Sequence, residues 1–246
     1  MGSAAAALAA ELGAEVTVLD LRPPAGGSLR FIQTDLGDAA AIDGALATIG
    51  RPLDALLNCQ GISGAAPGTP ADLVMRVNFL GARHLAEGAM AMMPDGGAVV
   101  SIASTGGLGW ARRLEPINEL LDQEGFDAGL EWVASHEELL SPTFPGAYSF
   151  SKQALIVWTM RRAVSAIAGG IRVNATSPGS TSTPMAGDFP AEGVEFTNRP
   201  SGRSSVPREQ AWPLVFLASP AASYVYGVNL VVDGGHSAAR TLGLLG

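Results

Sequence analysis

The sequence predicts a single α/β domain built on a doubly wound parallel sheet. Short runs rich in β-branched residues alternate along the chain with longer stretches rich in alanine and leucine. Several of the short runs are almost continuously apolar, which is typical of strands buried on both faces of a parallel sheet. Alternation of strands and helices favours helices on both faces of that sheet. A chain of 246 residues can be served by one core.

Six runs are predicted as strands and five stretches as helices. The predicted strands are short and apolar, and cover residues 15–20, 29–34, 53–58, 98–101, 171–175 and 229–232. The predicted helices are longer and amphipathic, and cover residues 3–12, 39–49, 70–92, 147–168 and 207–217. We interpret residues 1–246 as one domain.

Two segments interrupt this alternation. Residues 110–145 carry many acidic side chains and are interpreted as one or two surface helices inserted in a loop. Residues 179–205 are rich in Pro, Gly, Ser and Thr and predict a long, mobile loop. Loops of this length in compact domains often serve as lids or binding loops, so we expect the second segment to contact the substrate.

Composition excludes several classes of protein. The net charge of −8 leaves no basic footprint for a nucleic acid. No apolar run approaches the roughly 18 residues that span a membrane, and no basic segment opens a signal peptide. Cys59 is the single cysteine and has no disulfide partner, so a reducing cytoplasm is expected. The three histidines share no ligand spacing, and no metal site is predicted.

Lys152 is the only lysine among 15 basic residues, and it follows Tyr148 by four positions. On a helix these two positions share a face. A cation there would favour the phenolate and lower the pKa of the tyrosine, which is ordinarily about 10. Such a tyrosine could act as a general acid and base near neutral pH. The alternative is an ordinary surface pair on one helical turn.

Further short segments occur around this pair in a fixed order. They are Asp20 after a strand, Asp35-Leu36, Asn58-Cys59-Gln60-Gly61, Asn78 within Val-Asn-Phe-Leu-Gly, and the segments at residues 101–104, 148–152, 171–174, 177–179 and 232–235. In this order the chain resembles the short-chain dehydrogenase/reductase family over essentially its whole length. The resemblance implies a Rossmann-type fold.

The resemblance also implies catalytic roles for four residues. Tyr148 would be the acid/base, and Lys152 would lower its pKa and hold the nicotinamide ribose. Ser104 would hydrogen-bond the substrate oxygen, where charge develops in the transition state. Asn78 would hold a water molecule in a proton relay to Lys152. The alternatives are a helix-capping or loop hydroxyl for Ser104 and a helix-kink side chain for Asn78.

NAD is the cofactor that the resemblance implies. A carboxylate at Asp20 would accept hydrogen bonds from the adenosine ribose and repel a 2′-phosphate, although Arg22 could soften that preference. The alternative for Asp20 is a turn residue. The further expected cofactor-binding residues are Gly2, Asp35, Leu36, Asn58, Gly61, Tyr148, Lys152, Pro178, Gly179, Thr181 and Thr183. Cys59 and Gln60 depart from the family pattern, and Cys59 is interpreted as a packing residue.

The family's phosphate-binding turn reads Thr-Gly-x-x-x-Gly-x-Gly, and Met1-Gly2 aligns with its last two positions. The first strand and two of the glycines are therefore missing from the printed chain. We expect a start codon assigned too late or a truncated product. The alternative is a real deletion in which the first three residues are a tag remnant.

The spacing of Ser104 and Tyr148 is unusually long, because residues 110–145 lie between them. This insert resembles a bacterial 3α-hydroxysteroid dehydrogenase/carbonyl reductase subgroup. The resemblance implies an NAD(H)-dependent interconversion of a secondary alcohol and a ketone, and a homodimer or homotetramer formed through the C-terminal helix and strand. Trp110, Met185, Phe189 and Phe196 suit an apolar cyclic or steroid-like substrate or, alternatively, core packing. The alternatives are a non-catalytic dinucleotide-sensing protein and a ketoacyl-type reductase.

Overall fold

The computed structural model describes residues 1–24, 29–140 and 146–245. Within them, parallel strands form two sheets. In the smaller sheet, β1 (Thr17–Asp20) pairs with β2 (Arg30–Gln33). The larger sheet has the order β3-β4-β5-β6, and its strands are Ala55–Asn58, Ala98–Ile102, Arg172–Pro178 and Asn229–Val232. The parallel α/β architecture predicted from the sequence is confirmed.

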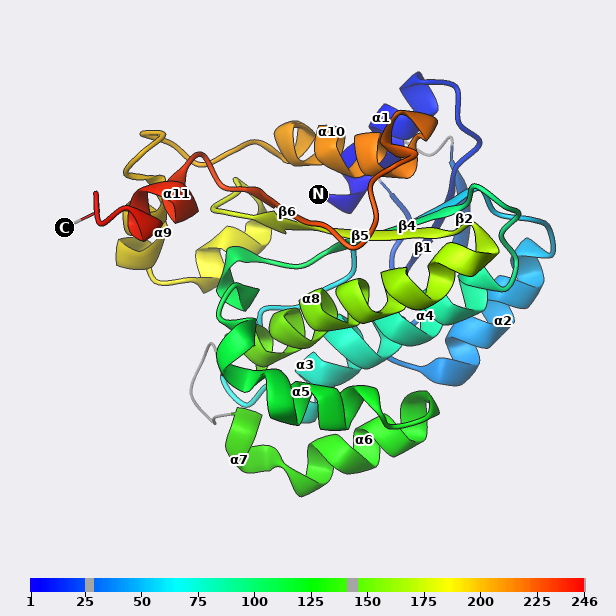
Figure 1. Cartoon of the computed structure of the whole chain (residues 1–246), viewed down its shortest axis with the longest axis horizontal. Coiled ribbons are helices and arrows are strands. Elements are labelled where there is room, and N and C mark those ends of the chain that lie inside the picture. Colours follow the sequence, from blue (N-terminus) through cyan, green and yellow to red (C-terminus); the bar gives the residue numbers. More distant parts are fainter. Residues whose placement is uncertain (25–28, 141–145, 246) are drawn as a thin grey trace.

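The sheet is interrupted between β1 and β3, which share no ladder within the described residues. At this place the sequence predicts a missing strand, and the described residues supply none. One apolar cluster nevertheless spans the interruption, because Leu19 of β1, Ile32 of β2 and Leu56 of β3 pack around helices α2 (Ala39–Ile49) and α4 (Gly81–Met90). Figure 1 shows β1 and β2 at the end of the molecule where α2 lies.

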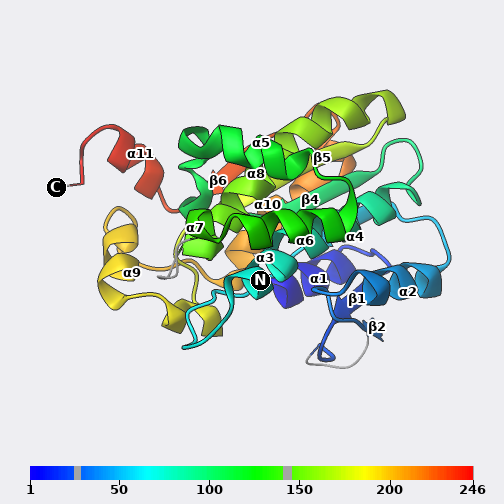
Figure 2. The ribbon, with the colours of Figure 1, turned by 90° about the horizontal axis from the view of Figure 1, so that it is seen from below.

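Helices cover both faces of the larger sheet (Figures 1 and 2). On one face, α1 (Gly2–Glu11) and α10 (Pro207–Ala218) pack through Leu8 and Leu214 against Val100 of β4. On the other face, α8 (Gly146–Ala166) belongs to the main core with Val99 of β4 and Val173 of β5. Val99 and Val100 lie on opposite faces because side chains alternate along a strand.

The stretch predicted as one helix over residues 70–92 is divided into α3 (Ala71–Met75), a π-helical turn (Arg76–Leu80) and α4. Gly81 follows the π turn directly. A Cβ atom on Gly81 would lie 1.8 Å from the carbonyl oxygen of Leu36, so the segment after β2 touches the backbone of α4 here. Only glycine permits this approach. Asn78 lies within this wider turn, and π-helical turns of this kind are frequent at functional sites.

The insert forms α5 (Leu114–Leu121), α6 (Gly125–Ser135) and α7 (Glu137–Leu140), and residues 141–145 lie outside the described residues. The prediction of one or two surface helices is wrong, because the insert contributes to the main core. Ile117 and Leu120 are fully buried, and the ring of Trp132 stacks parallel to that of Phe150 at 6.1 Å. The insert thus adds a further layer outside α8 (Figure 1).

The segment of residues 179–205 is more ordered than the predicted loop. It contains a 3₁₀ turn (Pro184–Asp188) and α9 (Ala191–Asn198). Its two ends are paired, because the Ser205 N–H donates to the Ser180 carbonyl at 3.0 Å and the Ser182 N–H donates to the Ser205 carbonyl at 2.8 Å. Residues 179–205 therefore form a loop whose two ends are joined, and we call this loop the excursion.

Candidate active site

The candidate site lies where parallel strands end. Asn58, Ile102 and Pro178 are the last residues of β3, β4 and β5. In parallel α/β sheets, ligands bind outside these carboxyl ends. Ser104 comes two residues after β4, and Tyr148 lies in the first turn of α8. The structure therefore brings these two predicted residues together.

Tyr148 is 9% exposed and is hydrogen-bonded to Ser104. Ser104 also caps the following 3₁₀ turn, because its hydroxyl accepts from the Gly106 N–H at 3.1 Å. Burial raises the pKa of Tyr148 above 10, and the hydrogen bond with Ser104 opposes this rise only in part. The predicted lowering of the Tyr148 pKa is therefore wrong for this structure, because the desolvation of the phenol raises the pKa by more than the hydrogen bond with Ser104 lowers it.

Lys152 is 3% exposed, and its ammonium group donates to the Ile102 carbonyl at 2.8 Å. Its Nζ atom lies 5.9 Å from the centroid of the Tyr148 ring. Burial lowers the pKa of Lys152 to about 8, because the charged form loses hydration. The lysine can therefore gain or lose a proton within one or two pH units of neutrality.

Asn78 is fully buried and fixes the loop that follows β3. Its Oδ1 atom accepts from the Ile62 N–H at 2.8 Å, and its Nδ2 atom donates to the Ile62 carbonyl at 2.9 Å. The same Nδ2 donates to Ser151 Oγ at 3.2 Å, and that hydroxyl donates to the Tyr148 carbonyl at 2.7 Å. Asn78 thus connects this loop to the helix that carries Tyr148 and Lys152.

Glycines leave space beside these side chains. A Cβ atom on Gly61 would lie 3.4 Å from Lys152 Nζ and 3.4 Å from Asn78 Oδ1. Gly2 is the first residue of α1, and its Cβ would lie 3.1 Å from the Cβ of Cys59. The N-terminus of α1 therefore lies beside the carboxyl end of β3, where helix N–H groups can bind phosphate.

Other predicted cofactor-binding residues already make internal contacts. The Asp20 carboxylate ends β1, is exposed, and accepts from the Arg22 N–H at 3.1 Å. Asp35 is exposed and accepts from the Gly37 N–H at 2.8 Å, while Leu36 packs against the α2–α4 cluster. Asn58 points to α4 and donates to the Ala82 carbonyl at 2.8 Å. Asp20 and Asp35 thus keep carboxylate oxygens at the surface, whereas Asn58 serves packing.

The segment after β5 closes against the segment after β6. Gly179 follows Pro178, and a Cβ atom on it would lie 2.8 Å from the Cβ of Asp233. Thr181 is 6% exposed and donates to the Gly179 carbonyl at 3.2 Å, and Thr183 donates to the Thr181 carbonyl at 3.4 Å. These contacts fix the start of the excursion.

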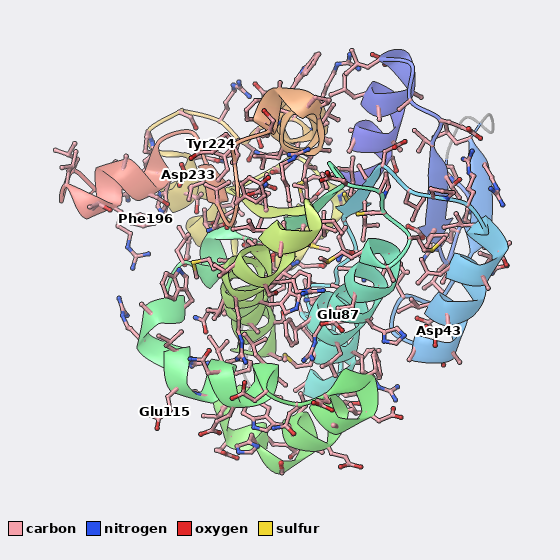
Figure 3. All side chains as sticks on the ribbon, turned by 45° about the vertical axis from the view of Figure 1, so that its right-hand side comes forward. Asp43, Glu87, Glu115, Phe196, Tyr224 and Asp233 are labelled. Carbon is pink, nitrogen blue, oxygen red and sulfur yellow. The ribbon has the colours of Figure 1, made fainter. Side chains whose placement is uncertain are left out.

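Of the four apolar side chains assigned to a pocket, Phe189 reaches Tyr148. The two rings are edge to face with centroids 5.5 Å apart. Phe196 instead meets His236 of α11 (His236–Thr241) at 5.2 Å, and Figure 3 shows it beside the Asp233 segment. Trp110 packs against the main core. Met185 is half-buried in the 3₁₀ turn before Phe189.

Sequence reasoning missed one contact near the site. The Ser63 hydroxyl donates to Asp188 Oδ2 at 2.5 Å across 125 residues of sequence. No motif marks either residue, and the only signal was that Asp188 falls within residues 179–205.

In the described part of the chain, no group of three or more His, Cys, Asp and Glu side chains could hold a metal ion. Across the same residues, no helix combines the length and the apolar character that crossing a membrane requires.

Comparisons with known proteins agree with this geometry. Residues 132–237 match a family described as Enoyl-(Acyl carrier protein) reductase. The chain is 31% identical to coniferyl-alcohol dehydrogenase of a Pseudomonas species, over 91% of this chain and 87% of the relative. It is also 31% identical to 3-alpha-hydroxysteroid dehydrogenase/carbonyl reductase of Comamonas testosteroni, over 96% and 91% of the two chains.

Among solved structures, 3-alpha-hydroxysteroid dehydrogenase from Pseudomonas sp. B-0831, complexed with NADH, superposes with a TM-score of 0.80. It shares 28% identity, and the match covers 98% of this chain and 94% of that one. These matches and the parallel fold define an oxidoreductase of the α/β class. The chain belongs to the short-chain dehydrogenase/reductase family.

Proposed function

We propose that this protein is an NAD(H)-dependent oxidoreductase that interconverts a secondary alcohol and a ketone. The observation that carries the proposal is the cluster of Ser104, Tyr148 and Lys152 beyond the carboxyl end of β4. Burial of Tyr148 and Lys152 at one strand end has no obvious benefit for stability, because a buried ammonium without a carboxylate partner is costly. Function is the simplest reason for keeping it there.

The residues present fit NAD(H). Lys152 uses one donor on Ile102, and the missing Cβ of Gly61 leaves space beside its ammonium group and beside Asn78. The exposed carboxylate of Asp20 suits ribose hydroxyls, and the N-terminus of α1 suits a phosphate. When bound, NAD(H) supplies or takes up a hydride at the reacting carbon of the substrate.

The protein's own part in the reaction is proton transfer and polarisation. In ketone reduction, the Ser104 hydroxyl donates a hydrogen bond to the substrate oxygen, and Tyr148 donates its proton there. The high pKa of the buried phenol opposes formation of the phenolate. The charged form of Lys152, with a pKa of about 8, can then stabilise the phenolate and supply protons. In this proposal Asn78 acts by holding the loop at Ile62.

An apolar cyclic substrate, including a steroid-like one, is the class that we propose. The support is the Phe189 ring beside Tyr148, since an aromatic wall beside the acid favours apolar alicyclic groups. The relative from Comamonas testosteroni is named for hydroxysteroids and carbonyl compounds, which is consistent with this class.

The proposal is tested with Tyr148→Phe and with Tyr224→Phe as the matched control, since Tyr224 is 95% exposed. NADH and NADPH binding is measured by fluorescence titration, and turnover is measured with cyclohexanol and a 3-hydroxysteroid. We expect NADH binding in all three proteins and loss of turnover only in Tyr148→Phe. Absence of dinucleotide binding would overturn the proposal. Binding without turnover in the unchanged protein would favour the non-catalytic alternative.

We also propose a cytoplasmic homodimer that pairs through α10 and β6. Trp212 and Phe216 of α10 are 50% and 44% exposed, and the outer edge of β6 has no strand partner within the described residues. The insert packs on α8, so that helix is not available for pairing over the surface that the insert covers. Light scattering of the unchanged protein and of Trp212→Ala tests the pairing, which a monomeric mass for the unchanged protein would contradict.

A further inference from the structure

A side-chain hydrogen bond joins the segment of residues 179–205 to the loop after β3. The Ser63 hydroxyl donates to Asp188 Oδ2 at 2.5 Å. Ser63 is 6% exposed, whereas Asp188 lies at the surface at the end of its 3₁₀ turn. A hydroxyl bonded to a carboxylate is a charge-assisted pair and is stronger than a neutral hydrogen bond. This contact crosses between two segments that no ladder connects at this point.

The Ser63 end of the contact is fixed. The preceding residue, Ile62, has both its N–H and its carbonyl bonded to the side chain of Asn78, at 2.8 and 2.9 Å. Asn78 is itself fully buried and bonded through Ser151 to the helix of Tyr148. Ser63 is therefore held by the core, whereas Asp188 lies at the surface.

The Asp188 end of the contact is followed by the residue that touches Tyr148, the proposed catalytic acid. Phe189 follows Asp188 directly, and its ring meets the Tyr148 ring edge to face at 5.5 Å. Tyr148 is thus connected to this contact from two sides. On one side, hydrogen bonds link its helix through Asn78 to the loop that carries Ser63. On the other side, Phe189 next to Asp188 contacts the Tyr148 ring. If the Ser63–Asp188 bond opens, the turn that carries Phe189 loses its bond to the loop after β3 and keeps the bond from the Phe189 N–H to the Ala186 carbonyl at 3.3 Å.

We propose that Ser63 and Asp188 are positioning residues that hold Phe189 over Tyr148, and that Phe189 thereby sets substrate size. With the bond closed, Phe189 restricts the space beside the reacting oxygen and favours monocyclic secondary alcohols over polycyclic ones. Opening the bond lets Phe189 withdraw and relaxes this preference. The inference rests on the proposed function and narrows its substrate class.

The test compares Ser63→Ala, Asp188→Ala and Phe189→Ala with Glu192→Ala, an exposed acidic residue of the same excursion. The kcat/KM for androsterone, a polycyclic alcohol, is divided by the kcat/KM for cyclohexanol, and the NADH Kd is measured in parallel. We expect the ratio to rise roughly tenfold in the first three variants, as for loss of one strong contact, and to stay unchanged in Glu192→Ala. The NADH Kd should stay unchanged throughout.

A double variant shows whether the bond acts through Phe189. If it does, Ser63→Ala should add nothing to the ratio once Phe189→Ala is present, since contacting residues are not additive. Full additivity would overturn the proposal. An equal loss for both substrates would also overturn it, because a merely structural role affects both alike.

Hydrogen exchange without substrate separates this proposal from the proposed function. We expect the amides of residues 184–198 to exchange faster in Ser63→Ala than in the unchanged protein or in Glu192→Ala. Unchanged exchange there would overturn the role of the bond, whatever the activity. Absence of turnover of both alcohols in the unchanged protein, with faster exchange in Ser63→Ala, would support the bond and contradict the proposed function alone.

Discussion

The ammonium group of Lys152 donates to the carbonyl oxygen of Ile102, the last residue of β4, over 2.8 Å. Among the ion pairs of the described residues, none includes Lys152. A dipole therefore takes the place of a counter-charge at the centre of the candidate site. Burial without a counter-charge disfavours the charged form of the lysine, and the cost of this to the free energy of folding can be measured.

Lys152→Met should stabilise the protein at neutral pH. The folded pKa of about 8 lies below the ordinary 10.5, so the unfolded chain binds more protons between these values, and stability of the unchanged protein rises with pH across that window. The shift corresponds to about 3 kcal/mol at 1.36 kcal/mol per pKa unit. We expect the advantage of the variant in urea unfolding to be largest below pH 8 and to shrink by up to about that amount towards pH 11. A difference independent of pH would contradict this explanation.

Cys59 should react slowly with alkylating reagents. Loss of hydration raises the pKa of its thiol to about 11, so the thiolate is scarce at pH 8. We expect native alkylation by iodoacetamide to be at least about tenfold slower than alkylation in urea, where the ordinary pKa of about 8.5 returns. Mass spectrometry over time measures both rates, and Cys59→Ser gives the background. Equal rates would show that the thiol is not desolvated.

Gly81→Ala should destabilise the fold strongly. The added Cβ would lie 1.8 Å from the Leu36 carbonyl oxygen. Because this oxygen belongs to the backbone, either α4 or the segment at Leu36 must move. We expect a loss of about 3 kcal/mol or more in the free energy of unfolding. Gly44→Ala is the matched control, because this glycine of α2 has no atom within 4 Å of its Cβ position. That variant should gain about 0.5–1 kcal/mol from helix propensity.

Asp20→Ser should weaken the preference for NADH over NADPH. The exposed carboxylate at the end of β1 would repel a 2′-phosphate, and removing it leaves Arg22 to attract one. We expect the ratio of the NADPH Kd to the NADH Kd to fall about tenfold or more. Glu15→Gln, an exposed carboxylate before the same strand, should leave the ratio unchanged. An unchanged ratio in Asp20→Ser would contradict the assigned role.

The fold could be predicted from the sequence because its strands are short apolar runs that alternate with amphipathic helices, and each local pattern agrees with the structure that forms. The strand at Asn229–Val232 and the helix at Ala39–Ile49 have the predicted bounds. The insert was not accessible, since α5 and α6 are amphipathic helices with many charges and their partner surface on α8 is set only by tertiary packing. The π turn before Gly81 was also hidden, because periodicity barely changes over five residues.

The candidate site was predictable as a set of residues, but its electrostatics were not. Spacing placed Tyr148 and Lys152 on one helical turn, yet the direction of the Tyr148 pKa depends on burial, which a spacing does not report. Nothing in the sequence favoured Phe189 over Phe196 as a pocket residue. The path of the backbone places Phe189 against Tyr148 and Phe196 against His236. The roles assigned to individual residues stay predictions until the variants above are measured.

The interruption between β1 and β3 has a mechanical consequence. Asp20 belongs to one ladder and Ile102, which supports Lys152, belongs to the other. Hydrogen-bonded ladders are directional and stiff, whereas the apolar cluster between them resists separation but only weakly resists sliding. Within the residues that the structure describes, the separation of Asp20 from Lys152 is thus held by apolar packing and not by a hydrogen-bonded ladder. A rigid molecule that bound Asp20 and Lys152 together would fix the position of one sheet relative to the other, and would thereby stiffen parts of the protein that it does not contact.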